Sequence, residues 1–285
     1  MLDYSQHSRW TEPGAFGALL DDVSADPSVL PEIVGGVMLH PFFAPAGTDR
    51  QDATLRSIPE ILGALIQRDS SPLSDTRECG KRVIGTCRNY ALLACAILRQ
   101  HGLPARFRVG YADYFTPDFW EDHWVCEYNT ADGWRLLDAE LTAAIRAHLG
   151  IAFDPAEIPR DRFLTAARAW QKLRRGDGDP ARFGVSILGI AGLGFVAGSL
   201  LRDLAALAGE EMMPWDYWGP ARDFGARRPI PPEWMDRLDD LANDLVVPLD
   251  PDPLALLAKY PWAALTPTVL SFPEGKPIEV SLERW

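Results

Sequence analysis

The stretch Gly85-Thr86-Cys87 opens a helical pattern, and this helix start constrains the fold more than any other feature of the chain. Thr86 is a good N-cap residue, so Cys87 is expected to be the first residue of the helix. Apolar side chains then recur at helical spacing, and Gly102 with Pro104 behind it predicts the helix end. A cysteine in the first turn lies at the positive end of the helix dipole, which favours its thiolate.

Strand patterns follow this helix. Residues 105–111 alternate between apolar and polar side chains, and residues 123–128 form a second such run. Residues 129–133 are turn-like, and residues 134–138 predict a third strand. A helix followed by strands that are joined by short turns predicts an α+β fold, in which the cysteine-bearing helix packs on an antiparallel sheet.

The predicted strands carry the partners that a catalytic cysteine needs. A thiol requires a base, and an imidazole base requires an acid that orients its ring. His123 and Asp138 are the candidates, because a hairpin between them would bring them side by side. Glu140 could substitute for Asp138. The backbone N–H of Cys87 is a natural oxyanion donor, and Gln51 is the candidate for a second donor.

Composition excludes several classes of protein. The net charge of -12 argues against nonspecific binding to nucleic acid. The four cysteines, Cys79, Cys87, Cys95 and Cys126, form no Cys-x-x-Cys pair, which argues against a zinc ribbon or a thioredoxin motif. So few thiols do not predict a disulfide framework, and the N-terminus shows no secretory pattern. We therefore expect a cytoplasmic protein without a metal or a cofactor.

One uncharged segment, residues 185–201, resembles a short membrane span. Five glycines fall between 184 and 198 and lower its hydrophobicity. We therefore expect a buried core helix, or two short helices, and no membrane association. A separate feature is an acidic run before His123, formed by Asp113, Asp118, Glu121 and Asp122. It is either a solvated loop or a rim that favours amine or guanidine groups.

The rest of the chain predicts further elements. Helices are expected over residues 55–68 (capped by Asp52 or Thr54), 141–149, 159–175 and 231–245, and short strands over residues 269–272 and 278–282. The character of the chain changes after Asp138. We therefore expect a catalytic core with N-terminal helices over residues 1–142. Residues 143–285 would be a mainly helical, Trp- and Pro-rich extension that packs on this core.

Several motifs resemble the core of the transglutaminase-like superfamily over roughly residues 50–142. They are Gly85-Thr86-Cys87 with Tyr90-Ala91-Leu92-Leu93, the run LRQHGLPARF over 98–107, Gly110-Tyr111, His123-Trp124, and WRLLD over 134–138. The resemblance implies a papain-like fold and a Cys87–His123–Asp138 triad. Members of the superfamily include amide cross-linkers, peptidases, deglycosylases and amide-forming enzymes, and some members have lost catalysis.

The chain departs from the family pattern at two places. Many members carry a residue between the histidine and the tryptophan, whereas Trp124 follows His123 directly and so faces the other side of the strand. The aspartate is usually followed by proline-threonine, and here Ala139-Glu140 follows Asp138. No triad residue is lost. Trp124 and Glu140 join Gln51 as the weaker candidates for oxyanion or substrate binding.

These observations predict a cysteine-dependent acyl-transfer enzyme that acts on an amide, ester or thioester through an acyl-enzyme, as a hydrolase of the amidase or peptidase type. One alternative is an amide-forming acyltransferase that uses a carrier-bound thioester or a glutamine-type donor. Another is a non-catalytic binding or scaffold protein. The expected partners are a peptide or small-molecule acyl substrate, with an amine acceptor or a carrier protein in the transferase case. The oligomeric state stays open.

Overall fold

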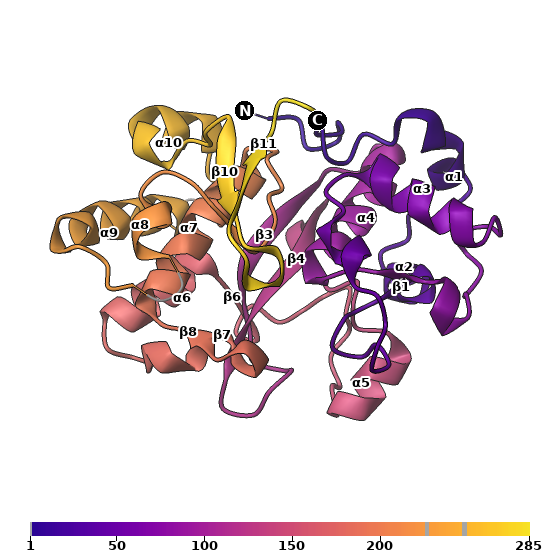
Figure 1. Cartoon of the computed structure of the whole chain (residues 1–285), viewed down its shortest axis with the longest axis horizontal. Helices are drawn as coiled ribbons and strands as arrows, with labels where there is room; N and C mark the ends of the chain where they lie inside the picture. The colour runs from indigo at the N-terminus through magenta and orange to yellow at the C-terminus, as the bar shows by residue number, and fades with distance from the viewer. Residues whose placement is uncertain (1, 226–227, 247–249) are drawn as a thin grey trace. The chain divides into compact units, whose positions relative to one another are not determined.

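The computed structural model describes residues 2–225, 228–246 and 250–285. The chain folds into two compact units, each assembled from segments that are not continuous in the sequence (Figure 1). The N-terminal unit contains residues 3–107 and 124–159. The C-terminal unit contains Leu2, residues 108–123 and the described residues from 160 onward. The single boundary expected after residue 142 differs from this division, because residues 143–159 group with the N-terminal unit.

The N-terminal unit is built around one long helix. Its helices are α1 (Gly17–Asp21), α2 (Leu30–Val37), α3 (Ile58–Arg68), α4 (Cys87–Gln100) and α5 (Ala143–Leu149), and its strands are β1 (Met38–Leu39), β2 (Val83–Ile84) and β5 (Gly133–Leu137). Short 3-10 turns occupy Gly14–Phe16, Gln51–Thr54 and Cys79–Lys81. Helices α1, α2 and α3 all contact α4.

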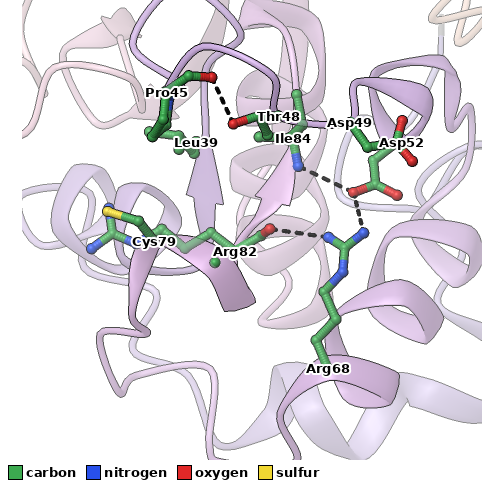
Figure 2. Close-up of a pocket in the computed structure, with 10 residues that line it drawn as sticks. Leu39, Pro45, Thr48, Asp49, Asp52, Arg68, Cys79, Arg82 and Ile84 are labelled. Carbon is green, nitrogen blue, oxygen red and sulfur yellow. Dashed lines mark hydrogen bonds and ion pairs between the residues drawn. The ribbon is translucent and has the colours of Figure 1, made fainter.

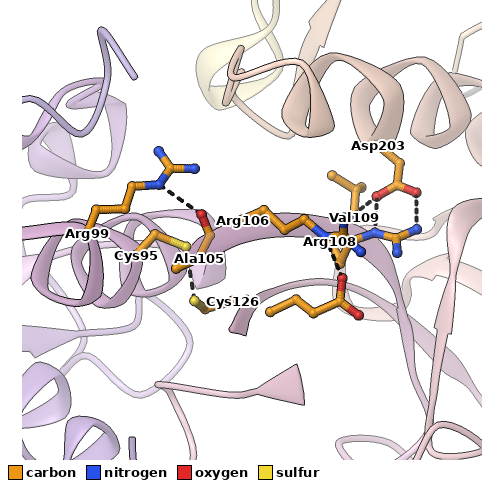
Figure 3. Close-up of polar contacts among 9 residues, drawn as sticks. Cys95, Arg99, Ala105, Arg106, Arg108, Val109, Cys126 and Asp203 are labelled. Carbon is orange, nitrogen blue, oxygen red and sulfur yellow. Dashed lines mark hydrogen bonds and ion pairs between the residues drawn. The ribbon is translucent and has the colours of Figure 1, made fainter. Parts of the chain in front are cut away.

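Helix α4 starts and ends where the sequence predicts. Thr86 caps it, and every residue from 87 to 99 is buried. Gly102 adopts the left-handed conformation just after the helix, with a φ of 73°. The sulfur atoms of Cys95, on this helix, and Cys126 lie 3.0 Å apart (Figure 3). This contact packs α4 against strand β4 and confirms the expected helix-on-sheet arrangement.

Helix α3 begins later than expected. Its N-cap is Ser57, and Ser57 and Glu60 form a reciprocal capping box, in which the backbone N–H of Ser57 donates to Glu60 Oε2 at 2.9 Å. The caps expected at Asp52 and Thr54 are wrong, since both residues belong to the preceding 3-10 turn.

The central strands are β3 (Ala105–Ala112) and β4 (Trp120–Thr130), and each contributes residues to both units. The strand order is β6-β3-β4-β7-β8, and β5 pairs with β4 in antiparallel register, with Cys126 opposite Leu137. The sheet is not purely antiparallel as expected, because β4 and β7 run parallel. Strand β4 begins at Trp120, which is in register with Phe183 of β7. The rings of these two residues stack, with their centroids 5.7 Å apart.

The C-terminal unit is mainly helical, as expected for the extension. Its helices are α6 (Ala166–Arg174), α7 (Leu193–Leu207), α8 (Ala221–Phe224), α9 (Pro232–Val246) and α10 (Pro253–Lys259). Its strands are β6 (Phe163–Thr165), β7 (Phe183–Val185), β8 (Ile190–Ala191), β9 (Asp216–Tyr217), β10 (Thr268–Ser271) and β11 (Ile278–Ser281). Helix α6 packs against α7 and α9 (Figure 1), and β9, β10 and β11 form a separate small sheet.

Two helix predictions in this unit are corrected. Residues 159–175 form strand β6 before helix α6, because residues 163–165 pair with β3. The apolar segment 185–201 is divided: its first part forms the β7–β8 hairpin, and only residues from Leu193 onward enter α7. Among the described residues, no helix has the length and apolar character needed to cross a membrane.

Two buried arginines of β3 are each neutralised within their own unit (Figure 3). In the N-terminal unit, Arg106 Nε donates to Glu127 Oε2 at 2.8 Å. In the C-terminal unit, Arg108 donates to both carboxylate oxygens of Asp203, at 3.1 and 2.8 Å, and the N–H of Val109 donates to the same carboxylate at 2.9 Å. Buried charges of this kind are tolerated only when they are paired.

We expect Asp203→Ala to lower the free energy of unfolding by about 3–5 kcal/mol, because it leaves the Arg108 guanidinium buried without its carboxylate. Chemical denaturation followed by circular dichroism measures this change. The control is Asp177→Ala, which breaks the exposed pair of Asp177 with Arg175 and should cost less than about 0.5 kcal/mol. Equal losses in the two variants would contradict a stabilising role for the buried pair.

Candidate active site

Cys87 is the first residue of α4 and is 7% exposed. The turn that presents it is fixed by a capping box, in which the backbone N–H and hydroxyl of Thr86 donate to Asn89 Oδ1 at 3.1 and 3.0 Å. The Asn89 amide also donates to the Leu55 carbonyl at 2.9 Å. The cap therefore holds the start of the helix at a defined position.

Asp138 lies directly after strand β5 and is 1% exposed. Its N–H donates to the Pro155 carbonyl at 2.8 Å, and its Oδ1 accepts the N–H of Glu140 at 3.0 Å. Glu140 is therefore in a turn that follows strand β5. The aspartate side chain caps this turn, which is why the strand ends at Leu137.

His123 and Trp124 are consecutive residues of β4, and both are buried. The His123 ring, in the C-terminal unit, makes edge contacts with Tyr114 and Phe115, with ring centroids 6.0 and 4.7 Å apart. The Trp124 ring, in the N-terminal unit, contacts Phe107 at 6.4 Å. Among the described residues, the buried indole N–H of Trp124 has no hydrogen-bond partner. Cys87, Asp138 and Glu140 belong to the same unit as Trp124.

Gln51 begins the 3-10 turn Gln51–Thr54 and is exposed. Next to that turn, the N-terminal unit holds a pocket of about 230 Å³, which Figure 2 shows. Asp52 lines this pocket. Its carboxylate pairs with Arg68 at 2.5 Å and accepts the N–H of Ile84 at 3.3 Å. Neither Gln51 nor Cys87 is among the residues that line this pocket.

The structure adds His40, a residue that the sequence analysis did not single out. Strands β1 and β2 are parallel, so His40 and Cys87 follow the same end of this strand pair. His40 is 7% exposed, and its Nδ1 lies 4.0 Å from Glu140 Oε1. Its backbone N–H donates to the Tyr90 hydroxyl. Burial first, and then the Glu140 charge, raise the pKa of Tyr90 well above its ordinary value.

Within the N-terminal unit, therefore, the Tyr90 phenol, one helical turn after Cys87, lies near the His40 backbone and the carboxylates of Glu140 and Asp138. The only sequence signal for His40 is that it directly follows a short apolar run, residues 37–39. Gly85 follows the apolar pair Val83-Ile84 in the same way. Strands of two residues leave no periodicity by which they can be recognised.

Two carboxylates of the acidic run before His123 bind partners within the C-terminal unit. Asp113 pairs with Arg162 at 2.7 Å. Glu121 accepts the Thr116 hydroxyl at 2.7 Å and the Ser186 N–H at 3.0 Å, and it also bonds the Ser186 hydroxyl. These two carboxylates hold neighbouring segments of the chain. Asp113 and Glu121 are therefore weaker candidates for a rim that binds amine ligands.

A comparison with known protein families gives a match that includes the proposed site residues. Residues 64–139, which contain Cys87, His123 and Asp138, match the model of the transglutaminase-like superfamily. Over these residues the α+β core is therefore similar to the transglutaminase-like superfamily. A search of the curated proteins found no match.

One solved structure that the chain resembles is a candidate cysteine protease from Cytophaga hutchinsonii. The two sequences are 15% identical, and the TM-score is 0.35. The similarity covers 57% of this chain and 44% of that protein, so the chain spans less than half of its length.

We expect Glu121→Ala to release the tip of the β7–β8 hairpin, because it removes the acceptor for Ser186. Hydrogen exchange of the amides around residue 186 should become roughly tenfold faster, which is the effect of losing about 1.4 kcal/mol of hydrogen bonding. Asp177→Ala is again the control, and a hairpin whose exchange is unchanged in Glu121→Ala would contradict this role for the carboxylate.

Proposed function

We propose that this protein is a cysteine-dependent acyl-transfer enzyme whose triad is Cys87, His123 and Asp138. The observation that carries the proposal is the position of Cys87. It is the first residue of a capped, buried helix, within the segment that matches the superfamily. A thiol at a helix N-terminus is stabilised as the thiolate by the helix dipole and is a better nucleophile near neutral pH.

In the proposed reaction, His123 takes the proton of the Cys87 thiol, and Sγ attacks the carbonyl carbon of the substrate. The tetrahedral oxyanion accepts a hydrogen bond from the N–H of Cys87. The intermediate collapses, the bond from carbon to the leaving group breaks, and His123 returns the proton to the leaving amine, alcohol or thiol. This leaves a thioester between the acyl group and Cys87.

The role proposed for Asp138 is to orient the His123 ring and to stabilise the imidazolium. Its burial supports this role, because a carboxylate that is 1% exposed is not disordered by solvent. The N–H of Glu140 donates to Oδ1 at 3.0 Å and helps to hold this oxygen in place. Glu140 thus acts on Asp138 through the backbone, and we do not assign it as a replacement for Asp138.

The acyl-enzyme is resolved by a second nucleophile. We propose water as this nucleophile, which makes the protein a hydrolase of amides, esters or thioesters from a peptide or a small molecule. The alternative is an amine acceptor, which would give an amide-forming acyltransferase with a carrier-bound or glutamine-type donor. Both routes use the same three residues and need no metal or cofactor.

The reactivity of Cys87 tests the proposed triad. We expect iodoacetamide to alkylate Cys87 rapidly at pH values well below the ordinary thiol pKa of about 8.5. Peptide mapping over a pH series measures the rate at each cysteine. Cys79, which is exposed, serves as the internal reference. Buried Cys126, whose pKa burial raises, should react most slowly.

His123→Ala should remove the rapid phase, so that Cys87 reacts no faster than Cys79 at low pH. Asp138→Asn should keep the fold and slow alkylation less than His123→Ala does, because it disturbs only the orientation of the base. A wild-type Cys87 that reacts no faster than Cys79, and that is indifferent to His123→Ala, would contradict the triad and favour the scaffold alternative.

A product assay separates hydrolysis from transfer. With 4-nitrophenyl acetate as acyl donor, the wild type should release 4-nitrophenol in a burst and then turn over to acetate. Adding a primary amine at millimolar concentration should leave acetate as the main product, measured by mass spectrometry. An acetamide that dominates in the presence of the amine would assign the protein to the transferase class instead.

A further inference from the structure

We propose that His40 is a catalytic residue that donates the second hydrogen bond to the oxyanion, through its Nε2–H. This inference rests on the proposed acyl transfer at Cys87. It replaces Gln51, which the sequence suggested for this role. Three properties of His40 support this role: its position, the orientation of its ring and its tautomer.

The position follows from strand pairing within the N-terminal unit. Leu39 is in register with Ile84, and the Gly85 N–H donates to the Leu39 carbonyl at 3.1 Å. His40 therefore lies opposite the short link that leads into Cys87. Tyr90, one helical turn after Cys87, accepts the backbone N–H of His40. The imidazole-bearing residue is thus tied both to the strand before the nucleophile and to the helix that carries it.

The orientation of the ring is fixed before any substrate binds. The N–H of Phe42 donates to His40 Nδ1 at 3.3 Å, and the N–H of Phe43 donates to the His40 carbonyl at 2.9 Å. The rings of Phe42 and Phe43 make edge contacts with the imidazole, with centroids 4.7 and 6.2 Å away. An oxyanion donor is effective when its geometry is organised in advance, since no reorganisation is then needed during the reaction.

The tautomer follows from the Phe42 contact. A neutral imidazole has one N–H and one acceptor nitrogen, and Nδ1 accepts from Phe42. A neutral ring that makes this contact carries its proton on Nε2, which is then a donor. Glu140 Oε1, at 4.0 Å from Nδ1, lies beyond hydrogen-bond distance of it. A histidine that must serve as a base at Nε2 needs the opposite tautomer, so His40 is arranged to donate a hydrogen bond.

The test compares two reactions of the same sulfur. Acylation by 4-nitrophenyl acetate passes through an oxyanion, whereas alkylation by iodoacetamide does not. The variants are His40→Gln, whose amide can accept from Phe42 and donate to the oxyanion, and His40→Met, which is of similar size and lacks the N–H. Thermal unfolding of both variants monitors the fold, and Gln51→Ala and Trp124→Phe are the comparison variants.

We expect His40→Met to slow acylation of Cys87 by about 10²–10³-fold, which is the effect of removing one oxyanion donor. Alkylation should stay within about threefold of the wild type, because its rate depends on the thiolate alone. His40→Gln should recover at least a tenth of the wild-type acylation rate, as expected when a neutral N–H donor remains. Gln51→Ala should acylate like the wild type.

Equal acylation by the Met and Gln variants, or the same loss in acylation and alkylation, would overturn the role of His40 while leaving the triad intact. A large loss of acylation in Trp124→Phe together with a normal rate in His40→Met would move the donor to the indole. Failure of the proposed function is a different result, in which wild-type Cys87 is acylated by neither the ester nor a thioester, and the His40 role falls with it.

Discussion

The burial of helix α4 is the constraint on which the rest of the N-terminal unit depends. Every residue from Cys87 to Arg99 is buried, so this helix is surrounded by the other elements of the unit and cannot shift alone. Its start is fixed by the Thr86–Asn89 capping box, and such caps contribute about 1 kcal/mol each. The thiol is thereby presented at a fixed point by a rigid element, as a preorganised nucleophile requires.

The elements that could be predicted are those whose local signals agree with their tertiary environment. Helix α4 has a cap, an apolar period and a terminating glycine, and the structure contains it within one residue of the prediction. Strand β6 lacked such agreement. Residues 163–165 read as helix, but they pair with β3, where a Cβ at Gly110 would lie 2.1 Å from the Leu164 carbonyl oxygen. The close approach of two strands at a glycine overrides local propensity.

The prediction for the apolar segment, residues 185–201, was wrong for a related reason. Gly189 and Gly192 have positive φ angles of 60° and 120°, which close the β7–β8 hairpin and separate it from α7. Strand β7 then pairs in parallel with β4, a contact between distant parts of the sequence. The candidate site divides in the same way. Cys87 and Asp138 sit at the ends of regular elements that local patterns reveal, whereas His40 is brought near Cys87 only by the pairing of two-residue strands.

The two imidazoles near the proposed chemistry differ in a way that assigns them different tasks. The Nδ1 atom of His40 already accepts a hydrogen bond from the chain, so this ring offers a proton from Nε2 and keeps it. His123 instead lies among aromatic rings, and in our proposal it shuttles a proton between sulfur and leaving group. Environments that push two similar groups toward opposite roles are what separates a donor from a base within one active site. In this proposal His40 cannot replace His123, because exchanging its tautomer would break the Phe42 contact that orients the ring.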